Sequence, residues 1–120
     1  MQEDFSPEKY LNDEKLLRLT INQLEKDFNE LGESIIEEIR FFEFEKLVFL
    51  LSEKLIDLKK KRSGILSQLF YRIDIPEEKI NLINDGENRF FENISVLILK
   101  RELQKVVIRE YYKNKFNDES

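Results

Sequence analysis

The sequence predicts an all-α single domain: an antiparallel helical bundle of four to five helices with a kink or irregular segment near 32–43. Apolar residues recur at steps of three and four along much of the chain, which is the helical period. Two prolines and three glycines are too few for the many turns of a sandwich or barrel. The chain of 120 residues suits one domain with a real core. We expect one domain over 1–120, with frayed ends at 1–6 and 116–120.

The first predicted helix covers residues 8–31, and Asn12 or Asp13 could cap again before its stronger part. Ser6 can cap its start, Pro7 suits the first helical position, and Glu8 complements the positive end of the helix dipole. Steps of four and three join its apolar residues into one stripe: Leu17, Ile21, Leu24, Phe28 and Leu31. Gly32 ends the helix, because glycine adopts the left-handed cap conformation without steric cost.

Two apolar stripes that are out of register predict the irregular segment. The short one is Ile35, Ile39 and Phe42, and the longer one is Phe44, Val48, Leu51, Leu55 and Leu58. The change of register places a break near residues 40–43. Large rings point to several sides here, so we expect this to be the most buried part of the fold: Phe41, Phe42, Phe44 and Phe49.

The second half of the chain contains clear stop and start signals. The basic run at 59–62 complements the carbonyl end of a helix, and Gly64 then stops it. A further helix is predicted over 65–73, and Pro76 opens a short one. A turn at 84–86 leads into a long helix that runs from about Asn88 toward Lys115.

This last helix is apolar on two sides, whereas a surface helix needs one. One side has Val96, Leu99, Leu103, Val106 and Val107, and the other has Ile94, Leu97, Ile98, Ile108 and Tyr112. A basic ridge, spaced four apart, runs through the second side: Arg101, Lys105 and Arg109.

Three accounts of the second side compete. The helix can lie in the centre of the bundle, with the basic stems along apolar surface. The side can instead face another protein, since arginine and tyrosine are common in interfaces. In the third account, the ridge binds an anionic ligand. The interface account gives these candidate residues: Leu97, Ile98, Arg101, Lys105, Ile108, Arg109 and Tyr112.

Composition argues against most chemistry. The chain has no histidine and no cysteine, which removes the commonest general base, zinc ligands and thiol nucleophiles. No glycine-rich phosphate loop is present. We therefore expect no enzyme activity, no metal and no cofactor. Carboxylates that could bind magnesium only if they converged are Glu33, Glu37, Glu38, Glu43 and Glu45; a solvated face with local ion pairs is the alternative.

Charge and hydropathy bear on partners and location. The net charge of −5 disfavours nucleic acid and anionic membranes as partners. The opening MQEDFSPEK is no secretion leader, and no apolar run is long enough to span a membrane. We expect a protein of the bacterial cytoplasm.

The function predicted from the sequence is a small helical interaction or adaptor module whose partner is another protein or a second copy, bound through the last helix. The alternative from another class is a nucleic-acid or phosphate binder. It would use the one concentrated basic run: Lys59, Lys60, Lys61 and Arg62. The competing interpretation of that run is a helix C-terminal charge cluster.

Overall fold

The computed structural model describes residues 4–35, 42–83 and 87–119. The described chain is helical and has no strand. In order, its elements are the 3₁₀ turn η1 (Pro7–Tyr10), α1 (Glu14–Glu30), α2 (Phe44–Lys61), α3 (Ile65–Ile73), α4 (Glu77–Leu82) and α5 (Glu87–Glu119). The predicted all-α single-domain bundle is confirmed.

Local signals explain where α1 begins and ends. The Asp13 carboxylate accepts a hydrogen bond from the Leu16 backbone N–H at 3.0 Å, so α1 begins after Asp13 rather than at residue 8. Pro7 opens the separate turn η1 instead. Gly32 takes φ +78°, and the Glu33 backbone N–H donates to the carbonyl of Phe28 at 2.9 Å. This bond closes the helix end as the glycine predicts.

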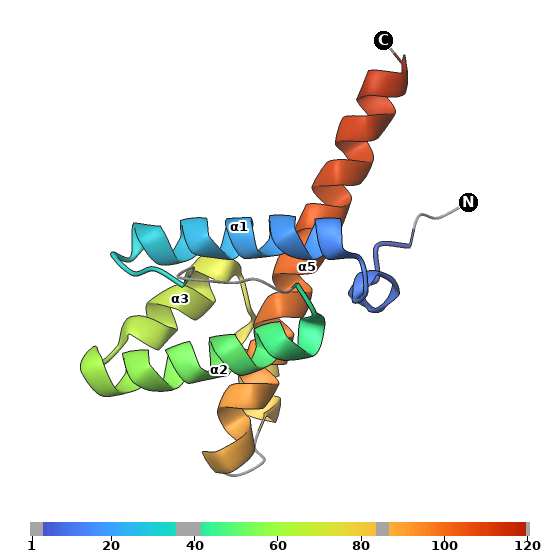
Figure 1. Cartoon of the computed structure of the whole chain (residues 1–120). Coiled ribbons are helices and arrows are strands. Elements are labelled where there is room, and N and C mark those ends of the chain that lie inside the picture. Colours follow the sequence, from blue (N-terminus) through green and yellow to red (C-terminus); the bar gives the residue numbers. More distant parts are fainter. Residues whose placement is uncertain (1–3, 36–41, 84–86, 120) are drawn as a thin grey trace.

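The irregular segment predicted near 32–43 separates α1 from α2. The described residues around it, 31–35 and 42–43, are not helical. Ile39 and Phe41, which the sequence placed here, lie outside the described residues, as does the predicted turn at 84–86. Figure 1 shows α1 and α2 running in the same direction. The short link 62–64 instead turns α3 back against α2.

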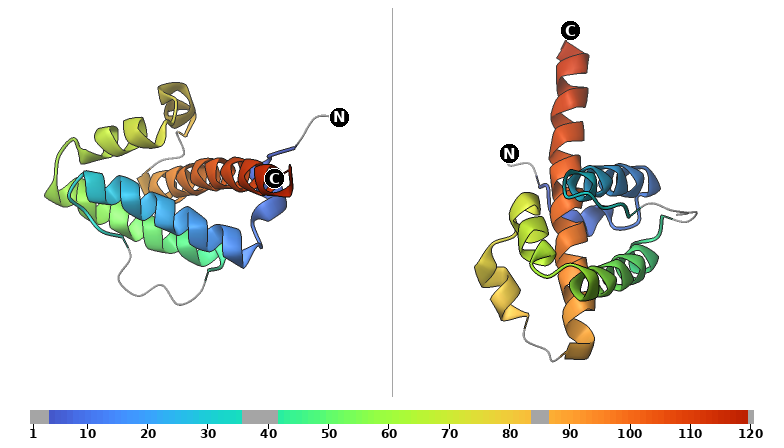
Figure 2. Two further views of the ribbon diagram at one scale, coloured as in Figure 1. Left: turned by 90° about the horizontal axis from the view of Figure 1, so that it is seen from above. Right: turned by 90° about the vertical axis from the view of Figure 1, so that its left-hand side faces the viewer.

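Helix α5 lies between two layers. Figure 2 shows α1 and α2 on one side of it and α3 and α4 on the other. Both apolar sides of α5 are therefore covered: Leu99 and Leu103 are 1% and 0% exposed, and Ile94 and Ile98 are both 0% exposed. Burial of each such side chain contributes about 1.5–3 kcal/mol. This arrangement agrees with the account that puts the last helix in the centre of the bundle.

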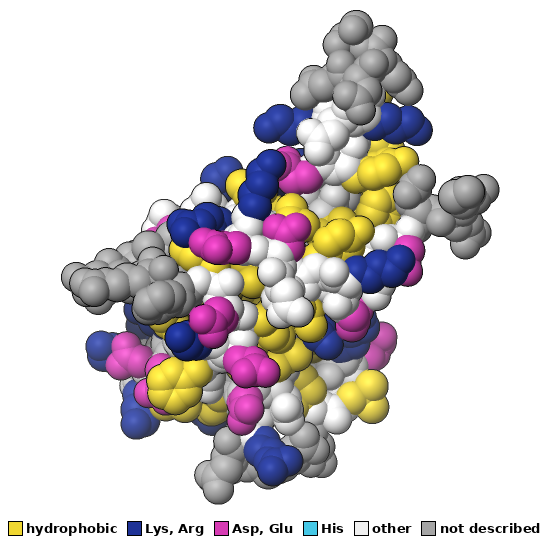
Figure 3. Space-filling view, turned by 45° about the vertical axis from the view of Figure 1, so that its right-hand side comes forward, with side chains coloured by type: hydrophobic (Ala, Val, Ile, Leu, Met, Phe, Trp, Pro, Cys, Tyr) yellow, Lys and Arg dark blue, Asp and Glu magenta, His cyan; other side chains and the backbone are white. Residues whose placement is uncertain are grey.

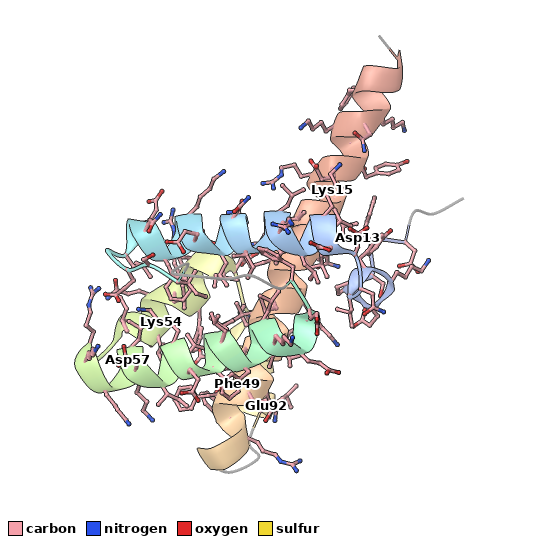
Figure 4. All side chains as sticks on the ribbon, in the orientation of Figure 1. Asp13, Lys15, Phe49, Lys54, Asp57 and Glu92 are labelled. Carbon is pink, nitrogen blue, oxygen red and sulfur yellow. The ribbon has the colours of Figure 1, made fainter. Side chains whose placement is uncertain are left out.

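The expectation that the phenylalanines form the most buried region was wrong. Phe42 and Phe44 are half-buried, and Phe49 is 69% exposed. Helix α2 faces the core with its aliphatic stripe: Leu47, Val48, Leu51, Leu55 and Leu58. Phe49 follows Val48 and is rotated about 100° from it around the helix, so it lies on the side of α2 away from α1 (Figure 4).

The fraying that the sequence predicts for 116–120 stays a prediction. Helix α5 continues to Glu119. No helix in the described parts of the chain combines the length and apolarity needed to cross a membrane.

Replacing Ile98 tests whether the second side of α5 is core. We expect Ile98→Ala to lower the free energy of unfolding by about 2–5 kcal/mol, because it leaves a cavity. The exposed control, Phe49→Ala, should change that free energy by about 0.5 kcal/mol or less. Urea unfolding followed by circular dichroism measures both. An unchanged stability of Ile98→Ala, together with a changed oligomeric state, would make this side an interface instead.

Candidate functional site

The core contains a pair of acidic side chains where α1, α3 and α5 meet. Glu102 of α5 is 0% exposed and Asp27 of α1 is 6% exposed. The two carboxyl groups lie close enough for Asp27 to act on the protonation of Glu102. Acidic residues are seldom buried to this extent without partners, so this pair is the clearest candidate site in the molecule.

Each carboxyl group has one oxygen paired with a cation. Lys105 Nζ lies 3.0 Å from Glu102 Oε1, and Arg72 Nε lies 3.4 Å from Asp27 Oδ1. The second oxygens, Glu102 Oε2 and Asp27 Oδ2, are buried and receive no hydrogen bond from a protein donor. Two acceptors without a donor need a proton between them to form a hydrogen bond.

The environment raises the pKa of Glu102 from its usual 4.5 to about 8. Burial is the main cause, because it disfavours the charged form. The hydrogen bond with Asp27 and the negative charge of Asp27 raise the pKa further, while Lys105 lowers it. The direction of this shift favours the protonated form of Glu102 near neutral pH.

The two cations connect the pair to α3. Lys105 Nζ also donates to the carbonyl of Ile73 at 2.6 Å, at the C-terminal end of α3, where carbonyls lack helical partners. Arg72 also pairs with Glu30 at 2.9 Å. Asp27 reaches the surface at a shallow groove of about 720 Å³ between α1 and α3, lined also by Leu31, Ser67, Gln68, Tyr71 and Arg72.

The carboxylates that the sequence offered for magnesium do not form this site. Glu33 pairs with Arg62 at 3.0 Å and with Lys54 at 3.5 Å, and Glu43 pairs with Lys46. Glu37 and Glu38 lie outside the described residues. Within the described parts of the chain, no group of three or more acidic side chains is placed to hold a metal ion.

The predicted interface residues of α5 divide into three kinds. Ile98 is fully buried within the monomer, so its assignment to an interface is corrected: the opposite layer already covers it. Leu97 and Ile108 are half-buried, and only Tyr112 and Arg109 count as exposed.

The basic ridge of α5 is largely engaged within the chain. Arg101 pairs with Asp74 at 3.0 Å, and Arg109 donates to Gln23 at 3.0 Å. With Lys105 bound to Glu102 and Ile73, the ridge joins α5 to its neighbours. For the exposed end of α5, the interface stays a prediction.

The basic run at the end of α2 is exposed. Arg62 donates to Glu33 and to the carbonyl of Leu31, and Lys61 pairs with Asp57. Lys59 Nζ lies 5.5 Å from the ring centroid of Phe91. A groove of about 320 Å³ adjoins this cluster, and Lys59, Arg62, Ser63, Gly64, Leu66, Ser67, Phe70, Phe90 and Phe91 line it.

Comparison with known proteins gives no relative from which a function can be transferred. The chain matches no family model, no curated protein and no solved structure.

The carboxyl pair was not found from the sequence, although a signal for it exists. Glu102 is the one charged residue in a row of α5 that otherwise reads Ser95, Leu99 and Val106, all buried. A charged residue at an apolar position of a helix predicts a buried charge with a partner. The partner, Asp27, is remote in the sequence and could not be identified by spacing.

Replacing Glu102 tests whether its side chain binds a proton in the folded protein. Because its pKa is raised in the folded protein, the folded state binds more protons than the unfolded state between about pH 4.5 and about pH 8. This group therefore destabilises the fold progressively as the pH rises through that window. We expect Glu102→Gln to gain stability relative to the wild type over the same window, by up to about 1.4 kcal/mol per pH unit.

Urea unfolding at a series of pH values measures this difference. The control is Glu53→Gln, at an exposed glutamate of α2, for which the difference from wild type should not follow this trend. A difference between Glu102→Gln and wild type that stays constant with pH would show that Glu102 is ionised in the folded state.

Proposed function

We propose that the protein is a non-enzymatic interaction module that self-associates through the projecting end of α5, residues 109–116. The supporting observation is that α5 continues past the body of the domain, beyond α1 (Figure 1). Tyr112 and Phe116 on this end are 46% and 67% exposed. In Figure 3, hydrophobic side chains follow this part of the molecule between lysine and arginine side chains.

An extended helix end with exposed rings gains from a partner. Most helical stability in proteins comes from tertiary packing rather than from intrinsic propensity. Aromatic rings bury about 150–250 Å² each. At about 25 cal/mol per Å², covering Tyr112 and Phe116 contributes several kcal/mol before the costs of association.

Charge favours a second copy as that partner. Arg109, Lys113 and Lys115 are exposed on the projecting end, whereas the whole chain has a net charge of −5. A groove of about 480 Å³ at the start of α1 and α2 combines acids with phenylalanines; Glu8, Leu11, Asn12, Phe42, Glu43, Phe44 and Glu45 line it. The basic aromatic end of one copy complements this acidic aromatic groove of another, and a reciprocal contact gives a closed two-fold dimer.

The proposal includes a bacterial cytoplasmic location. A chain without cysteine needs no oxidising compartment for its fold.

Light scattering after size exclusion tests self-association. We expect the molar mass to rise above that of the 14.6 kDa chain as the concentration increases. Phe116→Glu should keep the protein monomeric, because a charge would be buried in the contact. The control Phe49→Glu replaces a ring of similar exposure, 69% against 67%, and should leave association unchanged. A wild type that is monomeric at every concentration rules out the second copy as partner.

A second candidate function is the binding of an anionic ligand such as single-stranded nucleic acid at the end of α2. Lys59, Lys60 and Lys61 supply positive charge, and Phe90 and Phe91 lie beside the same groove. Aromatic rings and cations together are the usual components of such sites. The acidic net charge of the chain argues against it.

A salt titration with a labelled single-stranded oligonucleotide tests this candidate. Binding should weaken steeply as salt increases, because neutralised phosphates release their counterions. Lys60→Glu should weaken it further, while Lys15→Glu, on the exposed start of α1, serves as the control. No binding at low salt excludes the candidate.

A further inference from the structure

We propose that Asp27 and Glu102 form a proton-binding site, in which a single proton shared by the two carboxyl groups holds α1 against α5. The site is independent of the proposed self-association, because it lies inside the monomer and uses none of the exposed residues of α5.

The first argument is the pattern of partners. Each carboxyl group uses one oxygen for a cation, Lys105 in one case and Arg72 in the other. Each keeps one buried oxygen that no protein donor reaches, and the two groups lie close enough for Asp27 to act on the protonation of Glu102. A hydrogen bond between two carboxyl groups requires that one of them be protonated. One shared proton satisfies both remaining oxygens at once.

The second argument is charge balance. The groups around the site are Asp27 and Glu30 from α1, Arg72 from α3, and Glu102 and Lys105 from α5. Glu30 is 59% exposed, so solvent screens its charge. Arg72 and Lys105 are themselves 37% and 31% exposed, so solvent also weakens their compensation of the two buried carboxyl groups, and one proton removes the remaining cost of a second buried negative charge.

Within the part of the chain that the structure describes, Arg72 and Lys105 are the cations seen to pair with the two carboxyl groups. Helix α2 packs on α5 with its buried leucines, such as Leu51 and Leu55. Arg101 is paired with Asp74. Ser95 is buried on α5 too, but it lies seven residues before Glu102, roughly 10 Å along the helix axis.

Proton release would alter the contact between α1 and α5. Two neighbouring ionised carboxylates repel each other, as in other carboxyl pairs that hold one proton. Asp27 already lines the groove between α1 and α3, so the least hindered rearrangement moves Asp27 toward that groove and away from Glu102. The contact between α1 and α5 therefore weakens as the pH rises into the alkaline range.

Carbon-13 NMR of the side-chain carboxyl groups of glutamate tests the shared proton in the full chain. We expect the signal of Glu102, assigned by its loss in Glu102→Gln, to titrate at alkaline rather than acidic pH. Asp27→Asn keeps the shape of the side chain but removes its negative charge. If the proton is shared, the titration of Glu102 moves to lower pH in Asp27→Asn.

Two results would overturn the proposal. Titration of Glu102 in the acidic range of ordinary glutamates would show that the folded site holds no proton. An alkaline titration that does not move in Asp27→Asn would mean that burial alone retains the proton, without sharing. The first measurement uses the unmodified protein, so the proposal stays testable if Asp27→Asn fails to fold.

Hydrogen exchange tests whether the contact between α1 and α5 weakens at alkaline pH. After correction for the intrinsic effect of pH, amide protection in α1 and in the middle of α5 should fall between neutral and alkaline pH in the wild type. Glu102→Gln has no proton to release and should keep its protection over the same change. Equal losses of amide protection in the wild type and in Glu102→Gln would refute this pH dependence of the contact.

Discussion

The fold depends on the covering of α5 from both sides. Its middle turns present apolar side chains in two directions, and both must leave water because each buried residue contributes so much to stability. A layer of α1 and α2 covers one side, and α3 with α4 covers the other (Figure 2). Within their shared layer, α1 and α2 run in the same direction (Figure 1).

The same burial explains the carboxyl pair. A helix enclosed on both sides has little solvated face left in its middle, so Glu102 is inside the protein although glutamate is normally exposed. Asp27, Lys105 and Arg72 compensate part of that cost, and they are drawn from three helices. Contacts of this kind are directional, so they fix how the helices are placed relative to one another more strictly than apolar packing does. The pH dependence of stability that we predict follows from that arrangement.

Helix α5 thus has an enclosed middle and a projecting end. The middle of α5 is enclosed and holds the polar junction, whereas its last turns pass beyond the other helices with Tyr112 and Phe116 exposed. The enclosed part stabilises the monomer, and the projecting part is the surface that we propose for self-association. This separation is what allows substitutions at Phe116 to probe association without disturbing the core.

The sequence by itself determined the helical class and most helix limits, because periodicity, proline and glycine signals act locally. Helix α3 matches its predicted range 65–73, and Gly32 ends α1 through its own backbone conformation. The sequence also showed that α5 has two apolar sides, but both core and interface satisfy that pattern. Only the tertiary structure decided that Ile98 is core, that Phe49 is exposed, and that Asp27 meets Glu102. Each of these depends on contacts between residues remote in the chain, which local spacing does not encode.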